Sequence, residues 1–133
     1  MASVKQILIV DDDKDDTDFY AATVQQLRSS YLVKCIHDVR KALEWLMHTH
    51  VAPSLIISDV NMPYMNGFEF RKAILANQTL KQLAMPFVFL TTASTRINEF
   101  IAEQLSVVGI YEKPSSLQQM TNVFESILAR TGL

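Results

Sequence analysis

The sequence is poor in the residues that define several classes of protein. It has one cysteine, Cys35, among 133 residues, so a framework of internal disulfides is excluded. Three glycines and four prolines exclude a collagen-like or low-complexity chain. No apolar run approaches the roughly 18 residues that cross a bilayer, and the opening MASVKQILIV lacks the pattern of a secretory signal. We therefore expect a cytoplasmic protein that does not insert into membranes.

An excess of charge of one sign is also missing. The 12 Lys and Arg residues stand against 14 Asp and Glu residues, for a net charge of −2. Because this balance lacks the basic footprint of nucleic-acid-binding proteins, we expect no direct contact with nucleic acid. With 49% hydrophobic residues the chain can bury one core, so we expect a single domain over residues 1–133 without an output domain.

Short apolar runs alternate with helical patterns along the chain. The runs are rich in β-branched or aromatic residues, which is typical of strands covered on both faces of a parallel sheet. They cover residues 7–10, 55–57, 87–90 and 107–111, with a weaker run at 31–36. Lys34 interrupts the weaker run and predicts a strand near an edge of the sheet.

Apolar residues at helical spacing predict helices at 15–29, 38–49, 67–76, 96–105 and 116–130. Ser116 followed by Gln119 predicts a capping box for the last helix, and Asn77–Met85 is a longer connection. Strand and helix alternate five times, which predicts an α/β fold of the flavodoxin-like (βα)₅ kind. In that fold a doubly wound five-stranded parallel sheet has helices on both faces.

Ligands of such sheets bind beyond the carboxyl ends of the strands. Asp11–Asp13, Asp59, Thr91–Thr92 and Lys113 follow the expected strands. Crowded carboxylates repel unless a cation or a proton joins them, and Mg²⁺ is a hard cation that takes carboxylate, water and phosphate oxygens. A Lys and a Thr beside them would suit a phosphoryl group. The set favours Mg²⁺-dependent phosphoryl transfer, in which a carboxylate can itself be the nucleophile.

Four segments together carry a resemblance to a known family. In order and at strand ends, ILIVDDD, SLIISDVNMPYMNG, FVFLTTAS and GIYEKP resemble the receiver domain of two-component response regulators. The resemblance covers essentially the whole chain and is similar to the single-domain kind, of which the bacterial chemotaxis regulator is an example. It implies a phosphoprotein that signals through an aspartyl phosphate, and no enzyme that acts on a separate substrate.

The resemblance also implies a role for each site residue. Asp59 would take the phosphoryl group from a phosphohistidine donor and share the metal. Asp11 and Asp12 would be the acidic pair that holds Mg²⁺, Asp12 directly and Asp11 through water. Asn61 would offer its main-chain carbonyl to the same ion.

Other positions of the motifs have roles in the resemblance too. Thr91 would bond a phosphoryl oxygen and report phosphorylation by moving toward it, and Lys113 would pair with the phosphate. Pro63 and Gly67 match the turn after the acceptor strand. The Lys113–Pro114 bond is a candidate cis peptide.

Three departures from the family pattern concern the switch, access to the acceptor and the lifetime of the phosphoryl group. The usual aromatic residue three positions before the Lys is Ile110 here, and Tyr111, the next residue, is expected on the opposite face of its strand. Thr92 stands where a smaller Ala is commoner in the family, and we expect its extra bulk to narrow access to the acceptor. Ala93, two residues after Thr91, offers no polar side chain to orient an attacking water. With Asn61 two residues after Asp59, the sequence does not determine the lifetime of the phosphoryl group.

The other residues with chemical potential have plainer interpretations. Six of the eight Asp residues lie within residues 11–18, and four of these suit solvated positions at a helix N-terminus: Asp13, Asp15, Asp16 and Asp18. Asp13 is a further candidate contact of the metal. The three His residues (His37, His48 and His50) are expected on the surface, and Cys35 as a small buried hydrophobe.

Two other functions use overlapping residues. Asp13-Lys14-Asp15-Asp16-Thr17 fits the Asp-x-Asp-x-Thr pattern of haloacid-dehalogenase-like phosphatases, but it begins two residues after the strand and leaves Asp59 unexplained. A degenerate receiver, which binds partners without phosphorylation, would lack some of the five site residues. The acids Asp11, Asp13 and Asp15 have the spacing of an EF-hand calcium loop. That motif is excluded, because the sixth position of the loop is Asp16 where glycine is required, and the twelfth is Ala22 where glutamate is required.

The resemblance implies partners as well. The phosphoryl donor would be a sensor histidine kinase or a histidine phosphotransfer protein, and the reader an unknown downstream protein, with a phosphorelay intermediate as a variant. The surface that is read would be the face of the fourth expected helix, the fifth strand and the fifth helix, with Phe100, Gln104 and Ile110 as candidates. A homodimer through the same face is a further possibility.

Overall fold

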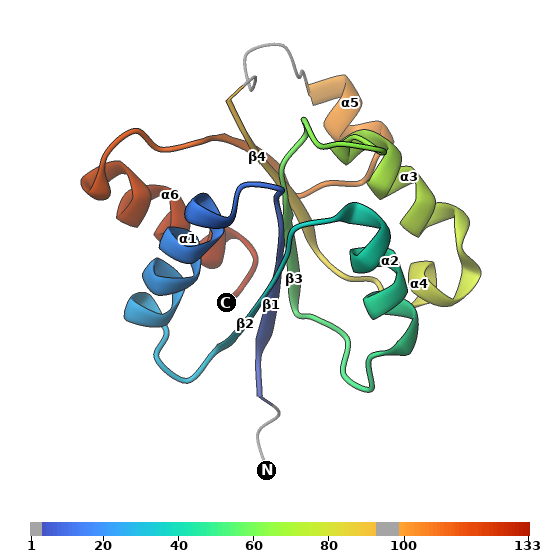
Figure 1. The fold of residues 1–133 in the computed structure, drawn as a ribbon, viewed down its shortest axis with the longest axis horizontal. Coiled ribbons are helices and arrows are strands. Elements are labelled where there is room, and N and C mark those ends of the chain that lie inside the picture. Colours follow the sequence, from blue (N-terminus) through green and yellow to red (C-terminus); the bar gives the residue numbers. More distant parts are fainter. Residues whose placement is uncertain (1–3, 93–98) are drawn as a thin grey trace.

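The computed structural model describes residues 4–92 and 99–133, and these form one parallel sheet between two layers of helices (Figure 1). In chain order the elements are β1 (Gln6–Val10), α1 (Lys14–Leu27), β2 (Leu32–Ile36), α2 (Val39–His48), β3 (Leu55–Ser58), α3 (Gly67–Ala76), α4 (Gln78–Gln82), β4 (Phe87–Thr91), α5 (Glu99–Gln104), β5 (Gly109–Glu112) and α6 (Leu117–Arg130). The five strands lie in the order β2-β1-β3-β4-β5, and every neighbouring pair is parallel. The predicted flavodoxin-like fold is confirmed.

The two faces of the sheet have separate apolar layers. Figure 1 shows α1 and α6 on one side of the sheet and α2 to α5 on the other. Leu8 and Val10 of β1 pack in the layer of α2 to α5, whereas Ile7 and Ile9 pack in the layer of α1 and α6. Every residue of β3 and β4 is buried. Strands covered on both faces explain the continuous apolar runs of the sequence.

The weaker run forms β2, which lies at one edge of the sheet, as Lys34 predicted. Lys34 and Leu32 are exposed there, because only one side of the strand has a neighbour. The other edge strand, β5, begins at Gly109, two residues later than predicted. The main-chain N–H of Val107 instead donates to Ala102 O at 3.0 Å and ends α5, and Ser106 before it has a φ of 52°.

A short helix that the sequence did not predict, α4, lies within the connection Asn77–Met85. The Asn77 side chain accepts from the main-chain N–H of Leu80 at 3.1 Å, and Leu80 is buried. One cap and one buried side chain therefore order a turn that is too short to show helical periodicity. The α5 helix lies within the predicted 96–105, of which 96–98 fall outside the described residues.

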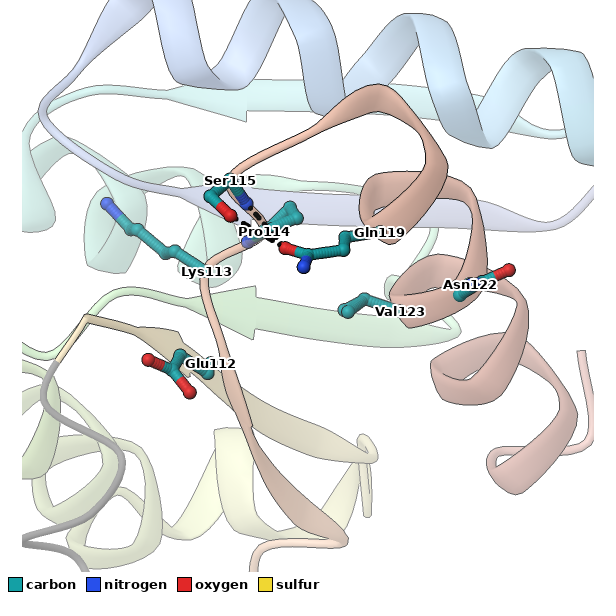
Figure 2. Close-up of a pocket in the computed structure, with 7 residues that line it drawn as sticks. All are labelled: Glu112, Lys113, Pro114, Ser115, Gln119, Asn122 and Val123. Atoms are coloured by element: carbon teal, nitrogen blue, oxygen red, sulfur yellow. Dashed lines mark hydrogen bonds between the residues drawn. The ribbon is translucent and has the colours of Figure 1, made fainter.

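The helix starts place the loops at the carboxyl edge of the sheet. Asp13 caps α1, Asn66 forms a full capping box with Glu69 at the start of α3, and Ser116 caps α6. The box predicted for Ser116 is half right. Its hydroxyl oxygen accepts from Gln119 N, but the Gln119 side chain accepts from Ser115 N and Ser115 Oγ, as Figure 2 shows.

Candidate functional site

The site lies at the carboxyl edge of the sheet, where four neighbouring strands end. Asp11 follows β1, Asp59 follows β3, Thr91 ends β4, and Lys113 follows β5. The main-chain N–H of Asp59 donates to Val10 O at 3.0 Å, which brings the two acidic strand ends together. Lys113 N donates to Thr91 O at 3.0 Å in the same way. Strand order thus gathers residues that are far apart in the sequence.

The Lys113 ammonium is the centre of a charged cluster. Its Nζ lies 2.9 Å from Asp11 Oδ2, 3.2 Å from Asp59 Oδ2 and 3.3 Å from Asp16 Oδ2. The side chains of Asp11 and Asp59 are 3% and 8% exposed, and that of Lys113 is 13% exposed. At such burial the ion pairs of Lys113 with Asp11 and Asp59 are poorly screened by water, whereas the Asp16 side chain is 38% exposed.

Burial and pairing act against each other in this cluster. Burial by itself would lower the pKa of Lys113, but the hydrogen bond to Asp11 and the charges of Asp11 and Asp59 outweigh it and hold that pKa well above its ordinary value. Burial also raises the pKa of Asp11, against the hydrogen bonds that it accepts from Asp13 N and Lys113. Lys113 is therefore an ammonium at neutral pH, and the Asp11 carboxylate depends on a nearby cation.

Three carboxylates could hold a metal ion. Asp11, Asp12 and Asp59 each offer an oxygen, and these oxygens lie within 4.8 Å of one another. Asp12 is exposed, whereas the other two are buried. A set of carboxylate oxygens that is open on one side suits a hard divalent cation that keeps some of its water. Asn61 is exposed in the loop that follows Asp59, and its part in metal binding stays a prediction.

The loop after Asp59 is tightly packed beneath the site. Val60 N donates to Asp59 Oδ1 at 2.7 Å, and Gly67 N donates to Val60 O at 2.7 Å. A Cβ on Gly67 would collide with the Asp59 carbonyl oxygen and lie 2.9 Å from Val60 Cα. Only glycine allows α3 to begin this close to the loop that follows Asp59.

The other motif residues lie at the ends of β4 and β5, and their roles stay predictions. Thr91 is fully buried at the end of β4, and Thr92 beside it is exposed. Ala93 lies outside the described residues. The expectation of a cis Lys113–Pro114 peptide is wrong, because the bond is trans.

Ile110 and Tyr111 face opposite sides of the sheet, as predicted. Ile110 packs in the layer of α2 to α5, and Tyr111 packs in the layer of α1 and α6. Within the described parts of the chain, the buried Tyr111 hydroxyl has no hydrogen-bond partner. The aromatic side chain of β5 therefore lies on the face away from α5.

A cleft of about 410 Å³ lies beside β5 and the start of α6, next to the site. Lys113 is among its lining residues, and Figure 2 shows the Lys113 side chain extending away from Gln119 and Asn122 of α6. The carboxylates that bind the Lys113 ammonium are not among the described lining residues, so the cleft lies beside the charged cluster.

The residues expected to have structural roles lie largely as predicted. Cys35 is only half-buried, and its thiol lies 3.7 Å from Thr17 O. Burial raises the pKa of this thiol, which disfavours a nucleophilic thiolate. His37 is exposed, and its Nε2 lies 2.9 Å from Thr17 Oγ1.

Asp16 is the site residue that the sequence interpretation missed. It was expected among the solvated acids, but its carboxylate reaches Lys113. Its signal was present, because Asp16 lies four residues before the buried Tyr20 and so one turn along the same face of α1. The acids Asp13, Asp15 and Asp18 are exposed, as expected, and Asp13 caps the helix.

Comparison with known proteins identifies the family. The family model described as the response regulator receiver domain matches residues 7–125. The chain belongs to this family. It is a receiver domain of the two-component response regulators, a family of phosphoacceptor signalling domains that bind a divalent metal.

Individual relatives agree with this family. The receiver is 32% identical over 111 residues to a probable cyclic di-GMP phosphodiesterase of Vibrio cholerae. The matched region covers 84% of this chain and 24% of that protein. It resembles the phosphorylated cyanobacterial phytochrome response regulator RcpA with a TM-score of 0.80 and 27% identity, over 95% of this chain and 92% of that one.

The Mn²⁺-bound response regulator Rcp1 is similar with a TM-score of 0.77 and 26% identity, over 94% and 92% of the two chains. The receiver spans 24%, 55% and 54% of the lengths of the first three curated relatives. Within its described residues, no helix has the length and apolar character to cross a membrane.

Proposed function

We propose that Asp59 is the phosphoacceptor of this receiver and that its phosphorylation depends on Mg²⁺. The observation that carries the proposal is the cluster in which Asp11, Asp12 and Asp59 lie within reach of one cation while Lys113 contacts the acceptor. A carboxylate oxygen of Asp59 attacks the phosphorus of a phosphohistidine. The P–N bond breaks as the P–O bond forms, and the imidazole leaves with the electron pair and takes up a proton.

Asp11, Asp12 and Asp59 would hold the ion, with the main-chain carbonyl of Asn61 as a further oxygen. Their open arrangement and the raised pKa of the buried Asp11 favour a divalent cation over a lone ammonium as the neutralising charge. When bound, Mg²⁺ would supply charge neutralisation for the incoming phosphoryl oxygens. The Mn²⁺-bound relative supports an ion of this class.

Lys113 and Thr91 bind the phosphoryl group in this proposal. Lys113 already contacts Asp59 Oδ2 at 3.2 Å, so its ammonium can follow the group that forms on that carboxylate. Thr91 ends the strand next to that of Asp59, where its hydroxyl is buried beside the acceptor edge. Both residues stabilise charge in place, which is the main protein contribution to phosphoryl transfer.

The proposed receiver signals by binding and has no separate substrate. Its donor is a sensor histidine kinase or a histidine phosphotransfer protein in the cytoplasm, and its reader is a further protein. The face of α5, β5 and α6 is the candidate output surface, with Gln104 exposed and Ile110 partly buried. The side chain of Phe100 lies outside the described residues. A homodimer through the same face is compatible with this function.

Intact mass after incubation with acetyl phosphate tests the acceptor. The wild type is expected to gain one phosphoryl group in Mg²⁺ and none in EDTA, whereas Asp59→Asn gains none in either. Asp15→Asn removes an exposed carboxylate of α1 and is expected to label like the wild type. Labelling of Asp59→Asn at the wild-type level would assign another acceptor. A wild type that neither labels nor binds Mg²⁺ would be a degenerate receiver.

A further inference from the structure

Lys113 has a third carboxylate partner outside the candidate metal site. Asp16 Oδ2 lies 3.3 Å from Lys113 Nζ, and no other hydrogen bond or ion pair of the described residues involves this carboxylate. The three carboxylates that could share an ion are Asp11, Asp12 and Asp59, so Asp16 is not among them. Its interaction is with the ammonium alone.

Helix α1 holds Asp16 in this position. The main-chain N–H of Asp16 donates to the side chain of Asp13, which caps the helix, at 3.1 Å. The next residue, Thr17, is buried. One turn further along, the buried ring of Tyr20 packs against Phe124 of α6 with 5.3 Å between the ring centroids. The carboxylate therefore projects from a fixed helix end toward the strand end that bears Lys113.

The hydrogen-bonding capacity of Lys113 is fully used. An ammonium has three N–H donors, and three carboxylates, those of Asp11, Asp16 and Asp59, surround this one. A phosphoryl oxygen can accept a bond from Lys113 only after one of these three contacts is released. A divalent cation on Asp11 and Asp59 would weaken their contacts with the ammonium. It would not bind Asp16, so the contact between Asp16 and Lys113 would remain.

We propose that Asp16 is a positioning residue that holds Lys113 toward α1 and competes with the phosphoryl group for its ammonium. The inference rests on the proposed function of Asp59. Asp16 would lower the affinity of the site for a phosphoryl group, because the Asp16–Lys113 contact must first be given up. It would also favour Mg²⁺ binding, because it offers Lys113 another partner when the cation takes Asp11 and Asp59.

These two effects have opposite signs, and that separates positioning from a general loss of structure. At saturating Mg²⁺, Asp16→Asn should bind beryllium trifluoride, a phosphoryl mimic that attaches to a carboxylate, about twofold to fivefold more tightly than the wild type. In the absence of the mimic it should bind Mg²⁺ about twofold to fivefold more weakly. Both changes have the size of one partly exposed ion pair. The binding of the mimic is measured by ¹⁹F NMR, and that of Mg²⁺ by titration calorimetry.

Matched variants complete the experiment. Asp15→Asn removes the same charge from the adjacent, exposed residue and should leave both affinities within experimental error of the wild type. Asp16→Glu keeps the charge and should restore both affinities toward wild type. In metal-free protein, the Lys113 side-chain ¹³Cε and ¹Hε resonances should shift in Asp16→Asn and stay in place in Asp15→Asn.

The outcomes distinguish this inference from the proposed function. If the wild type binds the mimic at Asp59 but Asp16→Asn and Asp15→Asn behave alike, Asp16 does not compete for Lys113, and the acceptor proposal stands. If both affinities of Asp16→Asn fall together, Asp16 has a structural role and the inference is wrong. If the wild type binds no mimic while it binds Mg²⁺, the acceptor proposal fails, and the inference fails with it.

Discussion

At the scale of single residues, Asp38 and Arg40 form a local ion pair that titration can measure. Arg40 Nη2 and Nε donate to the Asp38 carboxylate at 2.8 and 3.1 Å, and the main-chain N–H of Arg40 donates at 2.9 Å. These bonds, above all those from the guanidinium, lower the pKa of Asp38 to about 2. A lowered pKa means that the folded state favours the carboxylate. The contribution to stability is therefore complete above pH 3.8 and is lost as the pH falls through about 2.

The ¹³Cγ resonance of Asp38 is expected to titrate near pH 2 in the wild type. In Arg40→Gln the midpoint should rise toward 3.8, while the remaining main-chain bond keeps it lower than that. Lys41→Gln, which removes a neighbouring charge from the same helix, should leave the midpoint almost unchanged. A wild-type midpoint at the ordinary value would show that the guanidinium does not hold the carboxylate in solution.

Arg71 is a buried cation whose guanidinium binds carbonyls. Its Nε donates to Leu105 O at 2.8 Å and its Nη2 to Ser106 O at 3.0 Å, and burial lowers its pKa. Arg71→Met should cost about 2–3 kcal/mol of unfolding free energy, because two carbonyls at the end of α5 lose their donors. Urea unfolding measures the loss. The exposed neighbour gives the control, since Lys72→Met should change stability by less than about 0.5 kcal/mol; equal losses would contradict the role of Arg71.

At the scale of elements, the junction between β3 and α3 couples stability to the site. A methyl group at Gly67 would meet main-chain atoms of Asp59 and Val60, which cannot rotate away as a flexible side chain could. Gly67→Ala should destabilise the fold by about 1–3 kcal/mol and weaken Mg²⁺ binding, because the loop that follows Asp59 must move. Urea unfolding and calorimetric titration with Mg²⁺ measure the two effects.

Gly132 offers a contrast in the same chain. It has a φ of 75°, and a Cβ there would have no neighbour within 4 Å. Gly132→Ala should therefore cost only the strain of the left-handed backbone, about 1 kcal/mol, and leave Mg²⁺ binding unchanged. Equal Mg²⁺ affinities of Gly67→Ala and Gly132→Ala would show that the loop after Asp59 can shift without a loss of metal binding.

At the scale of the whole molecule, metal binding and folding should be linked. An ion that binds only the folded carboxylate cluster stabilises the fold by about 2.7 kcal/mol when its free concentration is 100-fold above its dissociation constant. Thermal or urea unfolding of the wild type should therefore shift in Mg²⁺ and stay in place in NaCl of equal ionic strength. Asp12→Asn should lose most of the shift, and Asp15→Asn should keep it. A full shift in Asp12→Asn would place the ion elsewhere.

Local patterns in the sequence determined most of the elements of this receiver. Continuous apolar runs predicted buried parallel strands, because a strand covered on both faces has no polar side to show. Lys34 predicted the edge position of β2, because a charged side chain within a strand needs a side that is open to water. The acids and the Lys at strand ends predicted a phosphoryl-transfer site, because the carboxyl ends of parallel strands share one edge.

Tertiary structure alone decided which of these groups touch. Of the acids within residues 11–18, only Asp11 and Asp16 reach Lys113 among the described contacts. Asp11 does so from the end of β1, whereas Asp16 does so because the burial of Thr17 and Tyr20 sets the rotation of α1 about its axis. The α4 turn depends on one cap and on Leu80 finding a place in the core. Periodicity reports which face of an element is buried, but distances between side chains depend on register and packing between elements that are far apart in the chain.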